Sequence, residues 1–351
     1  MAAEQIVEPG LSDGTREAAG DSRDDPAEAL RHAAVAFPGQ GSQEPCMGAA
    51  WYGHPAWHLV ERAEEVLGRP LAPYLLSADD APTATRDVQV SVFLTSLMAW
   101  EALRPVLGTP VVFFGHSLGQ LSALTAAGVL GFDDGIRLVA HRGDVTDEVC
   151  RRQSAGMAAV LGLDREHAVW ACGAAPGECW IANDNAPGQI VLAGTDAGLR
   201  RVEARARELG ARKVIRLEIA GAFHTPLMLA AVDPFAARLR TLSFAAPSRP
   251  VVSNADALPV ESGAVWARLL AEHLISPVSW RSSQLGLARQ GVRSLVEAGH
   301  GSTLTGIARR TVPQWETRNA DSPEAVAALA EELASGPAQA PVAEPVGRCR
   351  Q

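Results

Sequence analysis

A serine flanked by glycines follows a short apolar run in the first half of the chain. The segment Gly115-His116-Ser117-Leu118-Gly119 comes after a strand-like run at 110–114 and opens a helix-like stretch at 118–128. Glycines let the chain turn sharply and keep the serine hydroxyl clear of neighbouring side chains, while the following helix directs free amides toward developing negative charge. The segment predicts a nucleophile elbow with Ser117 as the nucleophile. The alternative is a chance Gly-Ser-Gly turn.

A serine nucleophile needs a general base, and the chain has nine histidines. His224 lies in the segment 221–226, where a strand-like run breaks before a helical one, and such a break presents its side chains. His54 and His58, in contrast, fall in a helical surface stretch. Spacing alone makes His224 a candidate base without excluding the other histidines.

Two further segments could complete such a site. The glycine-rich loop 37–43 follows the first predicted strand, and it can bring a backbone N–H close to the elbow and complete an oxyanion hole. Arg142 lies 25 residues after Ser117 on a predicted helix. Taken singly, the loop could be an ordinary turn and Arg142 an ordinary surface arginine.

Short apolar runs alternate with helical stretches around these segments, which predicts an α/β fold. The region 156–219 has the order strand, helix, strand, strand, helix, strand, which is the ferredoxin-like signature inserted into a larger α/β unit. Outside that region we expect strands at 33–37, 110–114, 251–254 and 294–297, the last taken as the final core strand, and helices at 88–107, 118–128, 133–149, 226–242, 266–274 and 284–290. Ser322-Pro323-Glu324 is a typical helix start and predicts a C-terminal helix at 321–335.

The composition excludes several classes of protein. Hydrophobic residues make up 47% and charged residues 20% of the 351 residues, so the chain is not wholly disordered, and its net charge of −9 argues against a nucleic-acid binder. Five scattered cysteines lack metal-ligand spacing, so we expect reduced thiols and no metal site. The longest apolar stretch, around Val92–Trp100, is interrupted and far short of the roughly 20 residues that span a bilayer. We therefore expect a cytoplasmic protein that does not enter a membrane, with a flexible acidic leader at 1–32 and a flexible tail at 336–351.

Seven motifs in order make the chain resemble the malonyl-CoA:acyl-carrier-protein transacylase family, which includes the acyltransferase domains of polyketide synthases. They lie across roughly residues 33–310, which is most of the chain. The motifs are FPGQGSQ at 37–43, GHSLG at 115–119, RLVAHRG at 137–143, GMAAVLG at 156–162, IANDNAPGQI at 181–190, AFHTPLM at 222–228, and VEAG at 296–299 with LTG at 304–306.

The resemblance implies an architecture and a set of roles. The fold would be an α/β-hydrolase-like large subdomain with a parallel sheet (33–154 and 221–320) carrying a ferredoxin-like small subdomain (155–220). Ser117 would attack the thioester of malonyl-CoA, His224 would act as the base, and the backbone carbonyl of His273 would orient His224. The remaining roles would fall to the amides of Gln40 and Leu118 as the oxyanion hole, Arg142 as a clamp for the malonyl carboxylate, and Phe223 and Asn185 in substrate binding. The phosphopantetheine thiol of an acyl carrier protein would then take the malonyl group from Ser117, in ping-pong order and without a cofactor.

Some residues depart from the family pattern. Gln120 stands where Glu is common, His273 replaces Gln or Asn, and 300–303 differs from the usual Pro-Gly-Lys type of loop. Phe223 favours malonyl over methylmalonyl, because family members with Ser at that place take methylmalonyl. Gly221 is small where many malonyl enzymes carry His, so a substituted extender such as ethylmalonyl stays open.

The resemblance also leaves open the pathway and the partner surface. The chain looks like a free-standing, monomeric enzyme of fatty-acid synthesis or a trans-acting polyketide acyltransferase. An editing acyl hydrolase and a docking scaffold with a vestigial site are the alternatives. A carrier protein is typically acidic, so we expect it to dock on basic residues. The candidates are Arg200, Arg201, Arg205, Arg309 and Arg310.

Overall fold

A computed structural model of the protein describes residues 30, 32–78 and 82–335. The expected leader at 1–32 and tail at 336–351 therefore lie almost wholly outside the described residues. Leu30 is the informative exception, since its side chain is fully buried in the main core. The packed chain thus starts at least three residues before the strand that was expected to open it.

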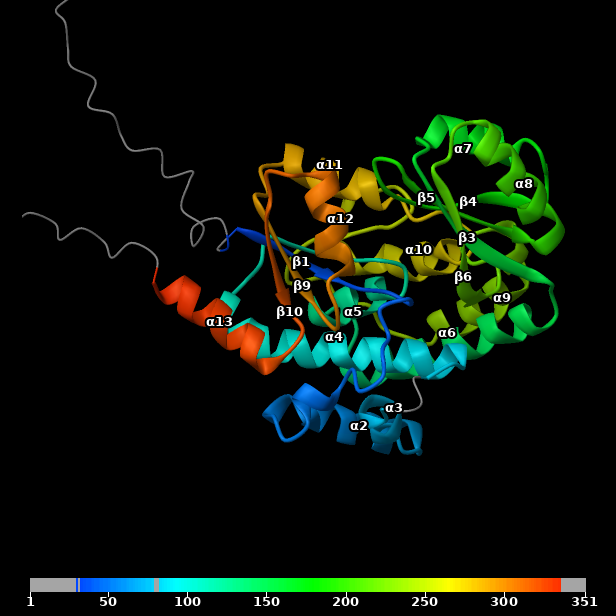
Figure 1. Ribbon diagram of the computed structural model, residues 1–351. Coiled ribbons are helices and arrows are strands. Elements are labelled where there is room, and N and C mark those ends of the chain that lie inside the picture. Colours follow the sequence, from blue (N-terminus) through cyan, green and yellow to red (C-terminus); the bar gives the residue numbers. More distant parts are fainter. Residues whose placement is uncertain (1–29, 31, 79–81, 336–351) are drawn as a thin grey trace, which may run out of the picture.

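The larger of two sheets forms the centre of the molecule (Figure 1). Neighbouring strands from β10 through β7 are parallel, and only the short edge strand β8 runs antiparallel to its neighbour β7. The expected strands are present, although 294–297 is not the last of them. Across the sheet the order is β10 (Glu316–Ala320), β9 (Ser294–Ala298), β1 (Ala33–Phe37), β2 (Val112–Gly115), β7 (Val251–Val252) and β8 (Pro259–Val260).

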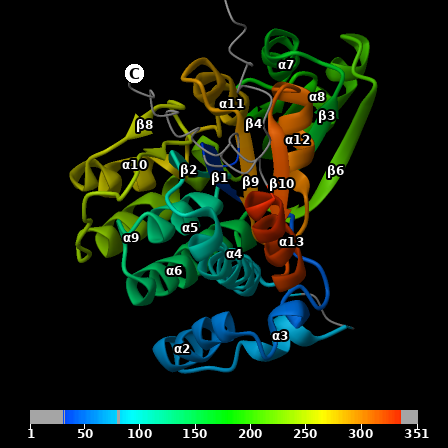
Figure 2. The ribbon, with the colours of Figure 1, turned by 90° about the vertical axis from the view of Figure 1, so that its left-hand side faces the viewer.

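Helices cover both faces of this sheet, as a parallel sheet requires (Figure 2). Val35, Phe37 and Phe113 pack into the core beneath α4 and α5, whereas Ala36 and Phe114 pack into a second core beneath α11 and α12. The α-helices of the large unit are α2 (His58–Leu67), α3 (Ala72–Leu76), α4 (Thr85–Leu107), α5 (Gly119–Ala126), α6 (Phe132–Arg151), α9 (Leu229–Leu239), α10 (Trp266–His273), α11 (Trp280–Arg289), α12 (Thr303–Thr311) and α13 (Pro323–Ala334). Short 3₁₀ helices lie at Ala49–Trp51, Pro55–Trp57, Pro226–Met228 and Gly263–Val265.

A second, smaller sheet is inserted between α6 and α9. Its strands are antiparallel and lie in the order β4 (Cys179–Ala186), β5 (Gln189–Thr195), β3 (Ala155–Leu161) and β6 (Lys213–Ala220), with α7 (Arg165–Cys172) and α8 (Asp196–Glu208) between them in sequence. The predicted order of strands and helices is confirmed. Ala158, Val160 and Leu192 face a core shared with α7 and α8, while Met157 and Val191 point from the opposite face toward the large unit. This alternation leaves one face of the small sheet free to form a wall of the space between the two sheets.

The long helix α4 is long and apolar enough, by length and composition alone, to cross a membrane. Its 23 residues contradict the expectation that the apolar stretch is far too short to do so. In the most apolar window, however, 72% of the residues are buried inside the protein. The helix is apolar on most sides because it packs against the sheet, α5, α6 and α13. It is therefore a core helix.

The C-terminal helix α13 begins as predicted. The Ser322 hydroxyl accepts a hydrogen bond from the Ala325 amide at 3.2 Å, and Pro323 occupies the first turn. Such a cap satisfies one of the free amides at the start of the helix.

Candidate active site

Ser117 lies on a tight turn between β2 and α5. Its φ of 53° is in the left-handed region, which a non-glycine residue enters only at a cost. The flanking glycines are required because a Cβ on Gly115 would collide with the Gly119 carbonyl, and a Cβ on Gly119 with the Phe37 carbonyl. The strand–turn–helix context of the predicted nucleophile elbow is therefore present, with the serine hydroxyl half-buried at its tip.

His224 faces Ser117 from the segment that follows the small sheet. Its Nε2 lies 2.7 Å from the Ser117 Oγ, and its Nδ1 lies 3.0 Å from the His273 carbonyl and 3.1 Å from the Ser276 carbonyl. Because carbonyl oxygens only accept, Nδ1 carries the proton and Nε2 is left to accept from the serine hydroxyl. Of the nine histidines, the structure therefore brings His224 to Ser117, and two carbonyls hold its ring where one was expected.

Burial sets the charge of these histidines. The pKa of His224 is lowered to about 3, first because the ring is buried and second because the positive charge of Arg142 is close. Burial also lowers the pKa of His273 well below its ordinary value. Both rings are thus neutral at physiological pH, and His224 can accept a proton.

Arg142 reaches the same point from α6. Its Nη2 donates to the Ser117 Oγ at 3.3 Å, and its Nη1 donates to the Gln89 Oε1 at 2.8 Å. The side chain is buried, and burial lowers its pKa to about 10, so the group stays charged at neutral pH. Within the described part of the chain no Asp or Glu oxygen lies within 4.0 Å of this guanidinium. A buried positive charge without an anionic partner is suited to bind a carboxylate of a ligand.

Asn254 supports the turn, although no local motif in the sequence indicates it. Its Oδ1 accepts from the Ser117 amide at 2.8 Å, and its Nδ2 donates to the Gly115 carbonyl at 2.7 Å. Its own amide donates to the Gln120 Oε1 at 3.3 Å, so the residue that departs from the family pattern also helps hold this support. Gln89 was missed as well, because it lies on an apolar core helix that carries no other sign of a site.

Two adjoining cavities lead to Ser117. The inner one, of about 50 Å³, lies directly at the pair Ser117 and His224, and the outer one, of about 180 Å³, opens toward the surface between the two sheets. Both cavities are lined by Gln40, His116, Met157, Asn183 and Ile219. The inner cavity is the smaller of the two, and Phe223 and His224 close its end at Ser117, so it favours a compact acyl group.

The remaining predicted substrate residues take different places around these cavities. Phe223 lines the inner cavity. Asn185 lines the outer one, where its Oδ1 lies 2.9 Å from the His116 Nε2 and fixes that ring. Gln40, in the glycine-rich loop, lines both cavities, whereas the Leu118 side chain is fully buried at the start of α5 and lines neither. Asn183, which was not singled out from the sequence, reaches the inner cavity where Asn185 does not.

Gly221 does not widen the acyl site. Its φ is +105°, and a side chain there would collide with the Cys150 Sγ. The thiol of Cys150 therefore fills the space beside Gly221, which removes the reason to expect a larger acyl group there.

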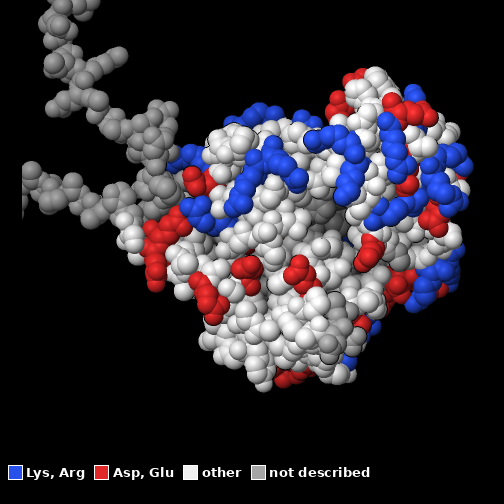
Figure 3. All heavy atoms as spheres, in the orientation of Figure 1, with Lys and Arg blue, Asp and Glu red and all other residues white. Residues whose placement is uncertain are grey.

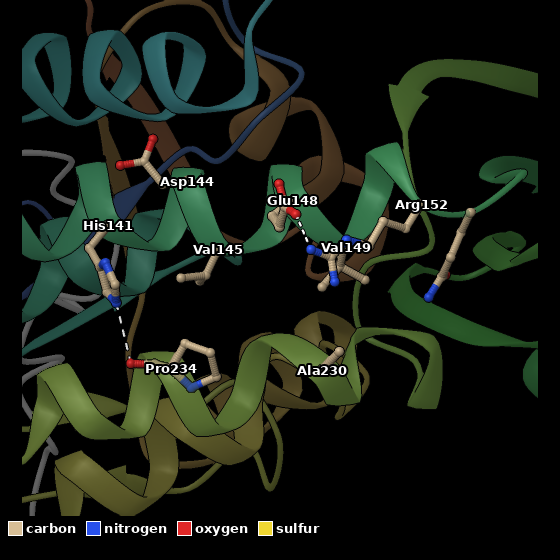
Figure 4. Close-up of a pocket in the computed structure, with 9 residues that line it drawn as sticks. His141, Asp144, Val145, Glu148, Val149, Arg152, Ala230 and Pro234 are labelled. Carbon is tan, nitrogen blue, oxygen red and sulfur yellow. Dashed lines mark hydrogen bonds and ion pairs between the residues drawn. The ribbon is translucent and has the colours of Figure 1, made fainter.

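A larger hollow between α6 and α9 is a different feature (Figure 4). It measures about 400 Å³ and is lined by neither Ser117 nor His224. The His141 Nε2 in it lies 3.3 Å from the Pro234 carbonyl, and Glu148 is paired with Arg152. Apart from the Gln153 Oε1, which is buried without a hydrogen-bond partner, these polar groups are paired within the protein, and the hollow holds no serine–histidine pair. Among the described residues, no group of three or more His, Cys, Asp or Glu side chains is placed to hold a metal ion.

Basic side chains gather on one face, over α11, α12 and the small-sheet unit, on both sides of a hollow (Figure 3). Arg310 donates to the Gln189 Oε1, and Gln189 lines the outer cavity, so Arg310 lies beside its mouth. Arg309, next to it on α12, donates to the Thr317 hydroxyl at 2.9 Å. The exposed arginines of α8 lie on the opposite side of the small sheet from the cavities, where Arg201 pairs with Glu178 and Arg205 pairs with Glu208. The predicted basic residues therefore form two separate groups.

Comparisons with known proteins agree with this geometry. The acyl transferase domain family matches residues 35–340. A malonyl CoA-acyl carrier protein transacylase of Bacillus subtilis is 34% identical over 299 residues, 84% of this chain and 94% of that protein. The polyketide biosynthesis protein ThaF of Burkholderia thailandensis is 36% identical over 292 residues, 82% of this chain but 25% of that longer protein. A solved complex of a type II polyketide synthase acyl-carrier protein with its malonyl-transacylase superposes with a TM-score of 0.81 at 31% identity, covering 85% of this chain and 98% of that one.

Proposed function

The chain belongs to the acyl transferase domain family, and we propose from this premise that it moves a malonyl group from malonyl-CoA to the phosphopantetheine thiol of an acyl carrier protein. The observation that carries the proposal is the buried Arg142 guanidinium, which lies 3.3 Å from the nucleophile and has no carboxylate partner in the described protein. A transferase of neutral acyl groups has no use for that charge, whereas a malonyl group brings a carboxylate to pair with it.

The reaction begins when malonyl-CoA enters through the outer cavity with its carboxylate against Arg142. His224 takes the proton from the Ser117 hydroxyl through Nε2, and the Oγ attacks the thioester carbonyl carbon. The amides of Gln40 and Leu118 are proposed to bind the resulting oxyanion, and the helix dipole of α5 adds to its stabilisation. Collapse of this intermediate expels the CoA thiolate, which takes the proton from His224 and leaves malonyl-Ser117.

The second half-reaction uses the same groups. The phosphopantetheine thiol gives its proton to His224 and attacks the malonyl ester, and Ser117 leaves as the hydroxyl. The carbonyls of His273 and Ser276 keep the His224 ring in place while its charge changes. No metal or cofactor is needed for either step. We propose that the enzyme works as a monomer, because one chain supplies every group, and that it works in the cytoplasm.

The acyl choice follows from the inner cavity. Its roughly 50 Å³ and the Phe223 ring favour malonyl over α-substituted extenders, and Asn183 is the polar side chain beside the acyl group. Asn185 does not reach the acyl group. It acts by holding the His116 ring, or by contacting the pantetheine arm in the outer cavity.

The strand orders support the finer description of the architecture. The large sheet corresponds to an α/β-hydrolase-like subdomain of residues 33–154 and 221–320, and the small sheet with α7 and α8 to a ferredoxin-like subdomain of residues 155–220. The C-terminal helix unit of residues 321–335 packs against α4 and β10.

Intact mass spectrometry tests the function directly. Mixing the protein with equal amounts of malonyl-, methylmalonyl-, ethylmalonyl- and acetyl-CoA should load malonyl on Ser117, and holo acyl carrier protein should then remove it. Ser117→Ala is the control for the acylated position. Arg142→Ala should lose malonyl loading by about 100-fold or more and keep acetyl loading, because only malonyl uses the clamp. Faster hydrolysis of acetyl thioesters than malonyl transfer by the wild type would instead indicate an editing hydrolase.

The acidic carrier protein is proposed to dock at the mouth of the outer cavity, beside α12. Arg310→Glu and Arg309→Glu should raise the KM for the carrier about tenfold and leave the kcat for loading from malonyl-CoA unchanged. The matched triple change of Arg200, Arg201 and Arg205 to Glu reports on the α8 group, which we expect to matter less because it lies across the small sheet from the cavities. A larger effect from the α8 change would move the docking surface there.

A further inference from the structure

Two cysteines of the small-sheet unit are brought together by a tight connection. Cys172 is the last residue of α7, and Cys179 is the first residue of β4. Between them, the Ala175 amide donates to the Cys172 carbonyl at 3.0 Å and the Cys179 amide donates to the Ala175 carbonyl at 3.2 Å. These bonds fold the connection back on itself, and both cysteines pack in the same small core, with Cys179 buried in it and Cys172 packed against it.

The two thiols are in contact and differ in environment. They are close enough to interact, and the hydrogen bond between the two thiols has the largest influence on the pKa of each. Cys179 is buried, whereas Cys172 is half-buried and can be reached by a small reagent. The hydrogen bond lowers the pKa of Cys172 and, together with burial, raises the pKa of Cys179. Cys172 is therefore the more readily ionised and more accessible thiol of the pair.

The other described cysteines lack such a neighbour. Cys150 is buried against Gly221, and its pKa is raised by burial to about 12. The Cys46 thiol donates to the Leu76 carbonyl at 3.3 Å. Neither is placed to trap an oxidised sulfur on a second thiol.

We propose that Cys172 and Cys179 form a reversible dithiol–disulfide pair that is oxidised by hydrogen peroxide. The Cys172 thiolate attacks one peroxide oxygen, the O–O bond breaks, and a sulfenic acid forms at Cys172 while hydroxide leaves and is protonated to water. The Cys179 sulfur then attacks the Cys172 sulfur, gives up its proton, and expels the second oxygen as water. Two thiols lose two electrons and two protons, and one peroxide becomes two waters; a dithiol reductant reverses the change.

The connection can adjust to a bond between the sulfurs. Gly173 and Gly177 lie in this connection and are exposed. Gly177 has a φ of +74°, and no other atom lies within 4 Å of the place where its Cβ would be. The disulfide would fix Glu178, which pairs with Arg201 on α8 and accepts from the Thr195 hydroxyl. It would not touch Ser117 or the cavities, so the oxidised protein should still be acylated.

Peptide mapping of the full-length protein tests the pair. Trypsin leaves both cysteines in the peptide 166–200, and a protease specific for glutamate separates them by cutting after Glu178. After treatment with one equivalent of hydrogen peroxide and alkylation, the tryptic peptide should lack two hydrogens and carry no alkyl group. After cutting at Glu178, its two halves should stay joined until a dithiol is added.

Matched variants separate this pair from other pairings. Cys172→Ser should abolish the link, whereas Cys46→Ser and Cys349→Ser should leave it unchanged. The proposal would be overturned if the two halves of the tryptic peptide separated without reductant. Cys172 would then be found unmodified, overoxidised or joined to Cys349. Malonyl loading of Ser117 measured on the same samples keeps this outcome distinct from failure of the proposed function.

Discussion

The Oγ of Ser117 lies 2.7 Å from the Nε2 of His224, and both residues have a positive φ, of 53° and 62°. Each left-handed non-glycine residue costs roughly 1–2 kcal/mol, so the fold holds both reacting residues against local strain. Asn254 fixes the backbone on one side of the pair, and the carbonyls of His273 and Ser276 fix the ring on the other. The result is a base that contacts its nucleophile before substrate arrives.

The pH dependence of malonyl loading should be flat across the neutral range. Because the pKa of His224 is lowered to about 3, the base is neutral at every pH above that value and gains nothing as pH rises through 6.5. Because the pKa of Arg142 is about 10, the clamp loses its charge and loading falls only as pH approaches and passes 10. Measured kcat/KM should therefore vary less than about twofold between pH 5 and 9. Acetyl-CoA is the control, since its loading does not use the clamp; an acid limb near 6.5 would contradict the neutral buried base.

Gln89 should control malonyl loading by positioning Arg142. Replacing it with Leu removes the acceptor at 2.8 Å from Nη1, and a hydrogen bond to a charged group is worth about 1.5–3 kcal/mol. We expect the KM for malonyl-CoA to rise about 10- to 100-fold while kcat/KM for acetyl-CoA is unchanged. Gln89→Glu should impair malonyl loading further, because its carboxylate would occupy Arg142. Equal losses for both acyl groups would indicate general damage to the core.

Asn254 should support the rate rather than substrate binding. Asn254→Ala leaves the Ser117 amide and the Gly115 carbonyl without their partners, which costs roughly 1–3 kcal/mol of stability for a buried group. We expect kcat for loading to fall about 10- to 100-fold with little change in KM. Asn254→Asp keeps the acceptor for the Ser117 amide but loses the donor to the Gly115 carbonyl. Its kcat should therefore lie between that of the wild type and that of Asn254→Ala. Wild-type kcat in the alanine variant would show that the turn holds without this side chain.

Gly221 should be needed for stability rather than for acyl choice. Gly221→Ala combines a positive φ with a collision against Cys150, and we expect a loss of about 2–4 kcal/mol in the free energy of unfolding. Denaturant unfolding measures this loss. The double change Gly221→Ala with Cys150→Ala should recover part of it, because the collision is relieved while the backbone strain remains. A changed ratio of malonyl to ethylmalonyl loading in either variant would instead show that this position selects the acyl group.

Elements with a clear apolar periodicity could be predicted from the sequence. Elements made of polar residues, and contacts between residues far apart in the chain, could not. The predicted strands at 33–37 and 156–163 are apolar and correspond to β1 and β3, whereas β10 is the polar run Glu316–Ala320 at the sheet edge and was not predicted. Helix α12 was missed because it follows β9 after a short glycine-rich turn. Ser117 and His224 could be found because their motifs are local.

The support of the site could not be found in the same way. Asn254 lies 137 residues from Ser117, and Gln89 lies 53 residues from Arg142, so only the folded chain brings each pair together. The buried state of Arg142 likewise depends on how α4 and α6 pack, and no local pattern indicates that packing.

The small sheet leaves and rejoins the large unit at one junction, where Gly156 pairs with Ala220 and the Gly221 amide donates to the Ala155 carbonyl at 3.2 Å. Ser117 and Arg142 precede the insertion and His224 follows it, so the insertion contributes a wall of the cavities through Met157, Asn183 and Ile219 but none of the reacting groups. The insertion therefore shapes the cavities without supplying a reacting group, but it is bonded to the support of the base. Asn183 on β4 bridges Val278, which lies two residues after the Ser276 carbonyl that holds His224. A change in the small sheet is thus transmitted to the orientation of the base as well as to the shape of the acyl site.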